Sequence, residues 1–229
     1  NQYISESTLK GTLTNLILAG TDTTTTALTC LPLVLLHRQE IQDCLHVEID
    51  HVIGGSRDPT LSDRSSMPYM EACLLETLRY ISHVPLAVPH AATCDTHVCG
   101  KVIPKNTTVY INLWALHHDE TFWKDPWKFD PQRFLDSEGH PVPAHHECRR
   151  RLMVFGAGRR VCLGEALAKN RLFLFAASLL QKFKFENDDS LTIQEIDPRK
   201  FSLGIVLHPK RFTIKAVKRT VDCNRILFS

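Results

Sequence analysis

The feature that most constrains this chain of 229 residues is a glycine-flanked cysteine directly before a strongly periodic helix. The run is Phe155-Gly-Ala-Gly158-Arg-Arg-Val-Cys162-Leu-Gly164, and apolar residues then recur at helical spacing from about Leu163 to Lys182. A thiolate at a helix N-terminus is stabilised by the helix dipole and by free backbone N–H groups. Gly158 and Gly164 would let the backbone approach a flat ligand, and Arg160 could neutralise a carboxylate on that ligand. A lone cysteine near glycine is usually a small buried apolar residue, but the full spacing favours a ligand.

The hydrophobic period predicts a mainly α fold with small β-sheets. Helices are expected over residues 1–37, His37–Ile53, Tyr69–Ser82 and Leu163–Lys182. Shorter periods predict strands at Val84–Val88, Thr93–Val98, Thr107–Ile111 and in the tail over 201–216. The turn-rich stretch 113–154 must be held by specific side chains, since long structureless segments are uncommon in compact domains. With no repeat and no linker, we expect one structural unit over residues 1–229.

Composition and charge exclude several classes. An apolar content of 43% with 23% charged residues is typical of globular proteins, and the ten-residue apolar run Ala27–Leu36 is too short to span a bilayer. Eight cysteines without a CxxC pair indicate reduced thiols. The cluster His145-His146-Glu147-Cys148 has no matching second cluster of metal-ligating residues elsewhere in the sequence, so it predicts no metal site. Residues 145–184 hold nine Lys or Arg and two acids. This excess attracts an acidic partner, and no motif favours nucleic acid.

Four motifs together, in order, resemble one family. The Cys162 loop resembles the haem-binding loop of the haem-thiolate monooxygenases, the cytochromes P-450. The run Ala19-Gly20-Thr21-Asp22-Thr23-Thr24 is similar to the oxygen-activation stretch of that family's long distal helix. Glu76-Thr77-Leu78-Arg79 is similar to its Glu-x-x-Arg motif, and Phe129-Asp130-Pro131-Gln132-Arg133-Phe134 to its Pro-Glu-Arg-Phe element, with Gln132 in place of Glu. The resemblance implies the C-terminal part of the cytochrome P-450 fold.

The resemblance also implies roles around a haem b. Cys162 would be the axial thiolate on the iron, which makes it both the metal ligand and a cofactor-binding residue. The other cofactor-binding residues would be Phe155, Gly158, Gly164, Ala19 and Gly20, with Arg160 and His90 on the propionates. Asp22 and Thr23 would deliver protons, because the Thr23 hydroxyl can bond back to a carbonyl one turn earlier and hold a water.

A second set of implied roles concerns the scaffold and the substrate. Glu76 and Arg79 share one helix face and would meet Arg133 in a buried network that pins the 113–154 stretch. Spacing alone would allow a weak surface pair. The substrate side would be lined by apolar residues, each of which could instead be plain core packing: Ala19, Val84, Leu86, Val88, Ile205 and Val206.

The implied activity is insertion of one oxygen atom of O2 into a lipophilic substrate. Electrons would come from NADPH through NADPH–cytochrome P-450 reductase, docked on the Arg149–Arg151 side, with cytochrome b5 as a further partner. The implied location is the endoplasmic reticulum membrane, on its cytosolic face. Within the family, the segments around Trp114 and His90 resemble the steroid 17-alpha-hydroxylase/17,20-lyase group. The tail around His208 resembles the family 2 hydroxylases of fatty acids and xenobiotics, and Leu18 adds bulk where steroid enzymes carry Gly, so both substrate classes stay open.

The resemblance covers the C-terminal half of such an enzyme. The membrane anchor and the helices before the distal helix would then be missing, and we expect residues 1–229 alone to be inactive. A truncated, non-catalytic product and a haem-binding sensor without turnover are the alternatives. Asp22 and Thr23 speak against the sensor, because a sensor needs no proton relay.

Overall fold

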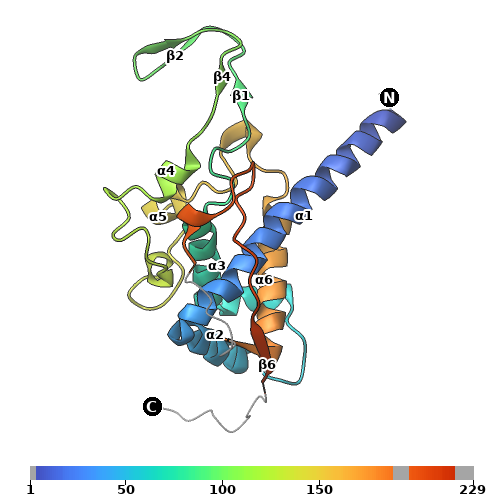
Figure 1. The fold of residues 1–229 in the computed structure, drawn as a ribbon, viewed down its shortest axis with the longest axis vertical. Helices are drawn as coiled ribbons and strands as arrows, with labels where there is room; N and C mark the ends of the chain where they lie inside the picture. Colours follow the sequence, from blue (N-terminus) through green and yellow to red (C-terminus); the bar gives the residue numbers. More distant parts are fainter. Residues whose placement is uncertain (1–3, 188–195, 220–229) are drawn as a thin grey trace.

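The computed structural model describes residues 4–187 and 196–219, and it is mainly helical (Figure 1). Its long helices are α1 (Glu6–His37), α2 (Gln39–Val52), α3 (Pro68–Ile81) and α6 (Glu165–Lys182). Short helical turns lie between and after them: η1 (Leu61–Ser66), α4 (Leu113–His117), η2 (Pro131–Phe134), α5 (Glu147–Arg151), η3 (Gly158–Arg160) and η4 (Pro198–Lys200). The prediction of a mainly α fold with small sheets is confirmed.

The strands form three small antiparallel ladders. β1 (His90–Ala91) pairs with β4 (Thr108–Val109), β2 (Thr96–Val98) with β3 (Lys101–Ile103), and β5 (Phe183–Glu186) with β6 (Lys215–Lys218). The β2–β3 hairpin projects from the body of the molecule at the top of Figure 1. In the second ladder Thr96 faces Ile103, and in the third Phe183 faces Lys218.

The predicted strand over Val84–Val88 is wrong. This segment forms turns, with Ala87 in the left-handed region at φ 54°, and the Pro85 carbonyl accepts from the Trp114 amide at 3.0 Å instead of a strand partner. Proline at 85 and 89 removes two ladder donors, which explains why an apolar alternation here does not produce a strand. In the tail, the alternation around Phe201 yields only an isolated bridge between Ser202 and His208.

The main hydrophobic core lies where the four long helices meet. The C-terminal half of α1 is buried, and Leu35, Leu45 and Phe173 are each fully enclosed between α1, α2 and α6. Gln42 on α2 is also fully buried: its Oε1 accepts from the Phe185 amide at 2.7 Å and its Nε2 donates to the Phe185 carbonyl at 3.0 Å. These two hydrogen bonds to the Phe185 backbone join α2 to β5 and leave neither end of the buried Gln42 amide unpaired.

The N-terminal half of α1 lies outside that core. It projects away from the body in Figure 1, and its apolar residues Leu9, Leu13 and Leu16–Leu18 are about half or more exposed. No helix in the described ranges is long and apolar enough to cross a membrane.

A second, smaller core holds the irregular stretch 113–154 against α3. Ala72 and Leu75 of α3 pack against Trp123, Phe134 and Val142, all of them buried. Beside this core, His118 stacks on Trp127 with ring centroids 4.2 Å apart. The stretch therefore has its own anchors although it contains only short helical turns.

Candidate functional site

The loop before α6 presents the Cys162 thiol at the surface. The Cys162 amide donates to the Phe155 carbonyl at 2.8 Å, and this bond closes the loop. Gly156 and Gly158 make the turns with φ values of 75° and 70°, a region that favours glycine. Cys162 is exposed and forms no disulfide. A side chain at Gly158 would meet nothing within 4 Å, so the surface beside the loop is open.

The start of α6 faces the same sulfur. Gly164 is the N-cap of α6 without a side-chain cap, and a Cβ placed on it would lie 3.8 Å from Cys162 Sγ. The N-terminus of α6 therefore lies next to the Cys162 thiol, and the positive end of its helix dipole acts at that position.

The surroundings of Cys162 fit a flat apolar ligand with carboxylates at its edge. Leu163 is 87% exposed, and Val161 is also exposed, so apolar side chains flank the thiol on both sides. The Arg160 side chain is exposed and has no hydrogen-bond or ion-pair partner within the described residues. An apolar surface, a soft sulfur donor and a free cation together match the thiolate-held haem that the sequence predicts.

The α1 segment predicted to face the haem has the expected local geometry. The Thr23 hydroxyl donates to the Ala19 carbonyl at 2.8 Å, one turn earlier. A hollow of about 450 Å³ lies between α1 and α6 beside Gly20, and a Cβ on Gly20 would lie 3.9 Å from Arg171 Nη1. Ala19 and Asp22 are exposed, whereas Gly20 and Thr23 are half-buried.

Glu76, Arg79 and Arg133 meet in the structure. Arg79 donates to both oxygens of Glu76, from Nε at 2.7 Å and from Nη2 at 2.8 Å, and neither side chain has any exposed surface. Arg133 Nε lies 3.5 Å from Glu76 Oε1, which also accepts from the Asp130 amide at 2.9 Å. Burial raises the pKa of the Glu76 carboxyl, and the bonds from Arg79 and the Asp130 amide oppose that rise.

The same arginines tie down the irregular stretch through its backbone. Arg79 donates to the carbonyls of His117 and Pro126, each at 2.8 Å. Arg133 donates to the Asp125 carbonyl at 2.9 Å. Carbonyls far apart in the stretch are thus bonded to charges anchored on α3 and η2, as the sequence requires of a segment without long helices.

The motif analysis missed His117, which links this network to the Cys162 loop. The Met153 amide donates to His117 Nε2 at 3.1 Å, and Nδ1 lies 2.9 Å from Ser82 Oγ. Burial and the nearby His118 lower the pKa of His117 to about 3, so the ring is neutral and can accept from Met153. The His117-His118 pair in an otherwise irregular stretch was the available signal.

Other predicted residues lie apart or on the surface. His90 is half-buried in β1 opposite Val109, and no contact joins it to Arg160 in the described structure. Among the predicted substrate residues, Val84 and Val206 are half-buried, while Leu86, Val88 and Ile205 are exposed. The segments 84–88 and 205–206 that carry these residues are neighbours in space, because the Leu207 amide donates to the His83 carbonyl at 2.7 Å.

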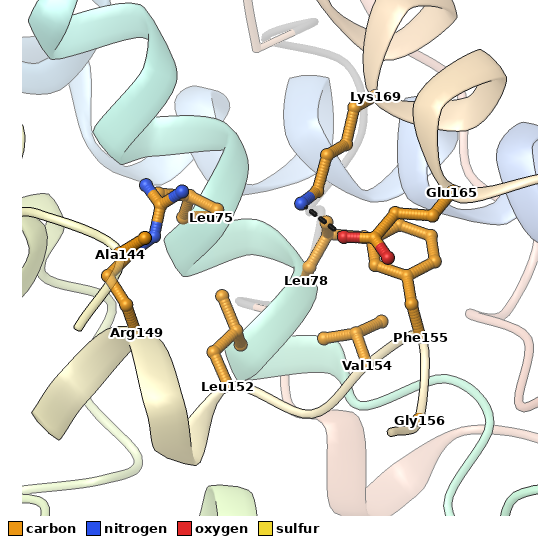
Figure 2. Close-up of a pocket in the computed structure, with 10 residues that line it drawn as sticks. All are labelled: Leu75, Leu78, Ala144, Arg149, Leu152, Val154, Phe155, Gly156, Glu165 and Lys169. Carbon is orange, nitrogen blue, oxygen red and sulfur yellow. Dashed lines mark hydrogen bonds and ion pairs between the residues drawn. The ribbon is translucent and has the colours of Figure 1, made fainter. Parts of the chain in front are cut away.

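A smaller hollow of about 190 Å³ lies behind the loop, between α3, α5 and α6 (Figure 2). Leu75, Leu78 and Leu152 form its apolar side, and Phe155 closes it toward the loop. Figure 2 shows Lys169 reaching across to Glu165, with which it forms an ion pair, and its ammonium group lies 5.3 Å from the centre of the Phe155 ring. These contacts fix Phe155 at the base of the Cys162 loop.

Comparison with known proteins identifies the family. A family model described as Cytochrome P450 matches residues 1–216. The chain is 43% identical over 198 residues to a Gallus gallus protein named steroid 17-alpha-hydroxylase/17,20 lyase, and that match covers 86% of this chain and 38% of the relative. An Oryzias latipes protein of the same name is 40% identical over 98% of this chain and 42% of its own length. Limanda limanda cytochrome P450 1A1 is 38% identical over 96% of this chain and 41% of its own length.

The chain therefore belongs to the cytochrome P450 family. It spans about two fifths of the length of the curated relatives that it matches. Family membership implies a haem held through a cysteine thiolate.

The buried network predicts a large stability effect. Glu76→Gln should lower the free energy of unfolding by about 3–5 kcal/mol, because it leaves Arg79 buried without its counter-charge. Urea unfolding measures this change. Glu6→Gln is the matched control: Glu6 pairs with Lys10 on an exposed turn of α1, and its loss should change the free energy by less than about 0.5 kcal/mol. Equal effects for the two substitutions would contradict the structural role of the network.

Proposed function

We propose that this chain forms the thiolate-bearing part of a haem monooxygenase that inserts one oxygen atom of O2 into a lipophilic substrate. The observation that carries the proposal is the exposed Cys162 thiol at the N-terminus of α6, between open glycine backbone and a free arginine. When bound, the haem supplies reductive activation of dioxygen. The residues of this chain supply the ligand, the orientation and the protons.

Each residue near the proposed haem has a defined task. The Cys162 thiolate would donate electron density to the iron, which favours O–O cleavage. Gly158 and Gly164 would leave room for the ring at the loop, beside Phe155, and Ala19 and Gly20 would do so on α1. Arg160 would pair with a haem propionate, and His90 would be a second partner of the propionates. The open backbone at Gly158 supports its assignment, and Arg160 is supported by an exposed side chain that has no partner among the described residues.

Proton delivery falls to Asp22 and Thr23. The Thr23 hydroxyl donates to the Ala19 carbonyl, so its oxygen keeps its lone pairs for a water molecule on the Gly20 side. Asp22 is the ionisable group next to it, and its side chain is 54% exposed. A carboxylate in contact with solvent can pass protons to that water.

The substrate is proposed as a lipophilic molecule. The residues proposed to face it are all apolar: Ala19, Val84, Leu86, Val88, Ile205 and Val206. A steroid is the narrower proposal, supported by relatives named for steroid 17-alpha-hydroxylation. Relatives named cytochrome P450 1A1 match nearly as well. A fatty acid or xenobiotic is the competing substrate class, because the tail around His208 resembles the family 2 hydroxylases.

The electron donor is proposed to be NADPH–cytochrome P-450 reductase, with cytochrome b5 as a second donor, at the endoplasmic reticulum membrane. Arg149 and Arg150 lie on α5, which flanks the hollow behind the Cys162 loop. Arg151 is committed elsewhere: it lies 3.2 Å from Glu147 and 3.5 Å from Asp119, and its guanidinium covers the Phe122 ring. Arg149 and Arg150 are therefore the better candidates for contact with an acidic partner.

The ligand assignment is tested by Cys162→Ser in the haem-loaded, full-length protein. The reduced, carbon-monoxide-bound form should lose the absorbance signature of thiolate ligation, because serine offers no soft donor. Cys94→Ser, at another exposed cysteine, should keep that signature. An unchanged spectrum in Cys162→Ser would place the ligand elsewhere.

Proton delivery is tested by Thr23→Ala. This variant should bind haem normally but divert electrons to hydrogen peroxide, lowering the product formed per NADPH several-fold. Thr12→Ala is the matched control, because Thr12 makes the same bond to a carbonyl one turn earlier, at 2.9 Å, on the outer part of α1. If Thr23→Ala and Thr12→Ala give equal product per NADPH, Thr23 is not the relay.

The docking face is tested by reversing Arg149 and Arg150 to Glu. Stopped-flow reduction by the reductase should slow about ten-fold or more at low salt and much less at high salt, since exposed charges are screened within about 10 Å at 0.1 M. Reversing Lys101 and Lys105, on the projecting hairpin, is the charge-matched control and should leave the rate unchanged. Slower reduction in the Lys101/Lys105 variant and an unchanged rate in the Arg149/Arg150 variant would place the docking face on the hairpin side.

A further inference from the structure

An ionisable cluster joins the middle of α1 to the C-terminal segment. His208 Nε2 lies 3.4 Å from Asp22 Oδ2, and His208 Nδ1 lies 3.1 Å from Thr26 Oγ1. Both ring nitrogens therefore face groups on α1, four residues apart on one side of the helix. The Thr26 residue is 3% exposed, so its hydroxyl is a fixed partner and gives the imidazole one orientation.

The backbone around His208 is also held. The Ser202 amide donates to the His208 carbonyl at 2.8 Å, and the His208 amide donates back to Ser202 at 3.3 Å. The preceding residue, Leu207, is buried and donates its amide to the His83 carbonyl. The segment that carries the imidazole is therefore fixed by hydrogen bonds, both within itself and to the residues after α3.

A second histidine stands next to the pair but cannot take its place. His83 is 4% exposed, and its Nδ1 has no hydrogen-bond partner in the described structure. Burial lowers the pKa of His83 to about 4, and the nearby Asp22 only partly opposes this, so His83 is neutral near pH 7. The Asp22 side chain is 54% exposed and that of His208 is 44% exposed, so this pair keeps contact with solvent. Arg171 of α6 approaches α1 at Gly20, two residues before Asp22.

We propose that His208 is a positioning residue for Asp22: its ring, oriented by Thr26, holds the Asp22 carboxylate in the conformation from which protons pass toward Thr23. This inference rests on the proposed function. A half-exposed aspartate without a partner samples several rotamers, and a partner with two fixed nitrogens selects one of them. The C-terminal segment thereby takes part in proton delivery, which the distal-helix motif alone does not include.

The test uses the haem-loaded, full-length protein with its reductase. His208→Leu should lower the product formed per NADPH several-fold and raise peroxide, while haem content, the thiolate signature and the spectral affinity for substrate stay unchanged. His208→Gln can still bond to Thr26 and reach Asp22, and it should recover part of the yield. His140→Leu is the matched control, because His140 also faces an aspartate, Asp136, at 3.9 Å but on an exposed turn, and its yield should equal that of the parent.

A double-mutant cycle separates positioning from a merely structural role. Asp22→Asn, His208→Leu and the double variant are compared in product per NADPH and in the urea midpoint of unfolding. If His208 acts through Asp22, the double variant should give the same yield as Asp22→Asn alone, and the midpoint shifts should not add.

Three results would overturn the inference. A parental yield in His208→Leu, or yields that multiply in the double variant, would show that His208 does not act through Asp22. Loss of the thiolate signature in both His208 variants would likewise assign His208 a structural role. Failure of the proposed function gives a different result: Asp22→Asn would then keep the parental yield, or the parent itself would form no product.

Discussion

The buried ion pair between Glu76 and Arg79 is the constraint on which the rest of the structure depends. Both groups are fully enclosed, so each needs the other, and Arg79 uses its remaining donors on the carbonyls of His117 and Pro126. The stretch 113–154 has only short helical turns and could not hold its course by local bonds. Its position follows from charges that α3 carries into the core, and the Met153 bond to His117 passes that order to the Cys162 loop.

Helix α6 joins the two halves of the proposed site. Its first turn faces the Cys162 sulfur, and one turn further Lys169 fixes Phe155 at the base of the loop. Two residues after Lys169, Arg171 lies beside Gly20 of α1, at the hollow that the two helices share. The buried residues Leu172, Phe173 and Ala176 pack the same helix into the main core. Because one helix carries all these contacts, it holds the loop and α1 relative to each other.

The sequence predicted the parts of this arrangement that local spacing encodes. The helical period gave α1, α2, α3 and α6 within a few residues, and the i,i+3 spacing put Glu76 and Arg79 on one face. The Thr23 bond to Ala19 follows from i,i+4 spacing in the same way. The strand expected at Val84–Val88 failed because two prolines and the left-handed Ala87 outweigh its apolar alternation. The adjacent pair His117-His118 marked one further residue, but spacing alone does not identify the contacts of His117 or His208, because their partners lie at least 35 residues away in the chain.

Polar anchors and exposed apolar surface together define what the proposed site can bind. Leu163, Leu203 and Ile205 are each more than 80% exposed, although burying such side chains contributes about 1.5–3 kcal/mol each. Leaving such side chains in water costs a modest amount of free energy. A flat or lipophilic ligand that covers them recovers most of it. The polar side chains nearby stay in contact with solvent: Arg160 beside the loop, Asp22 on α1, and His208 of the C-terminal segment. They would remain so at the edge of such a ligand. A purely polar ligand would leave the apolar side chains uncovered, so this distribution agrees with the proposal of a haem and a lipophilic substrate.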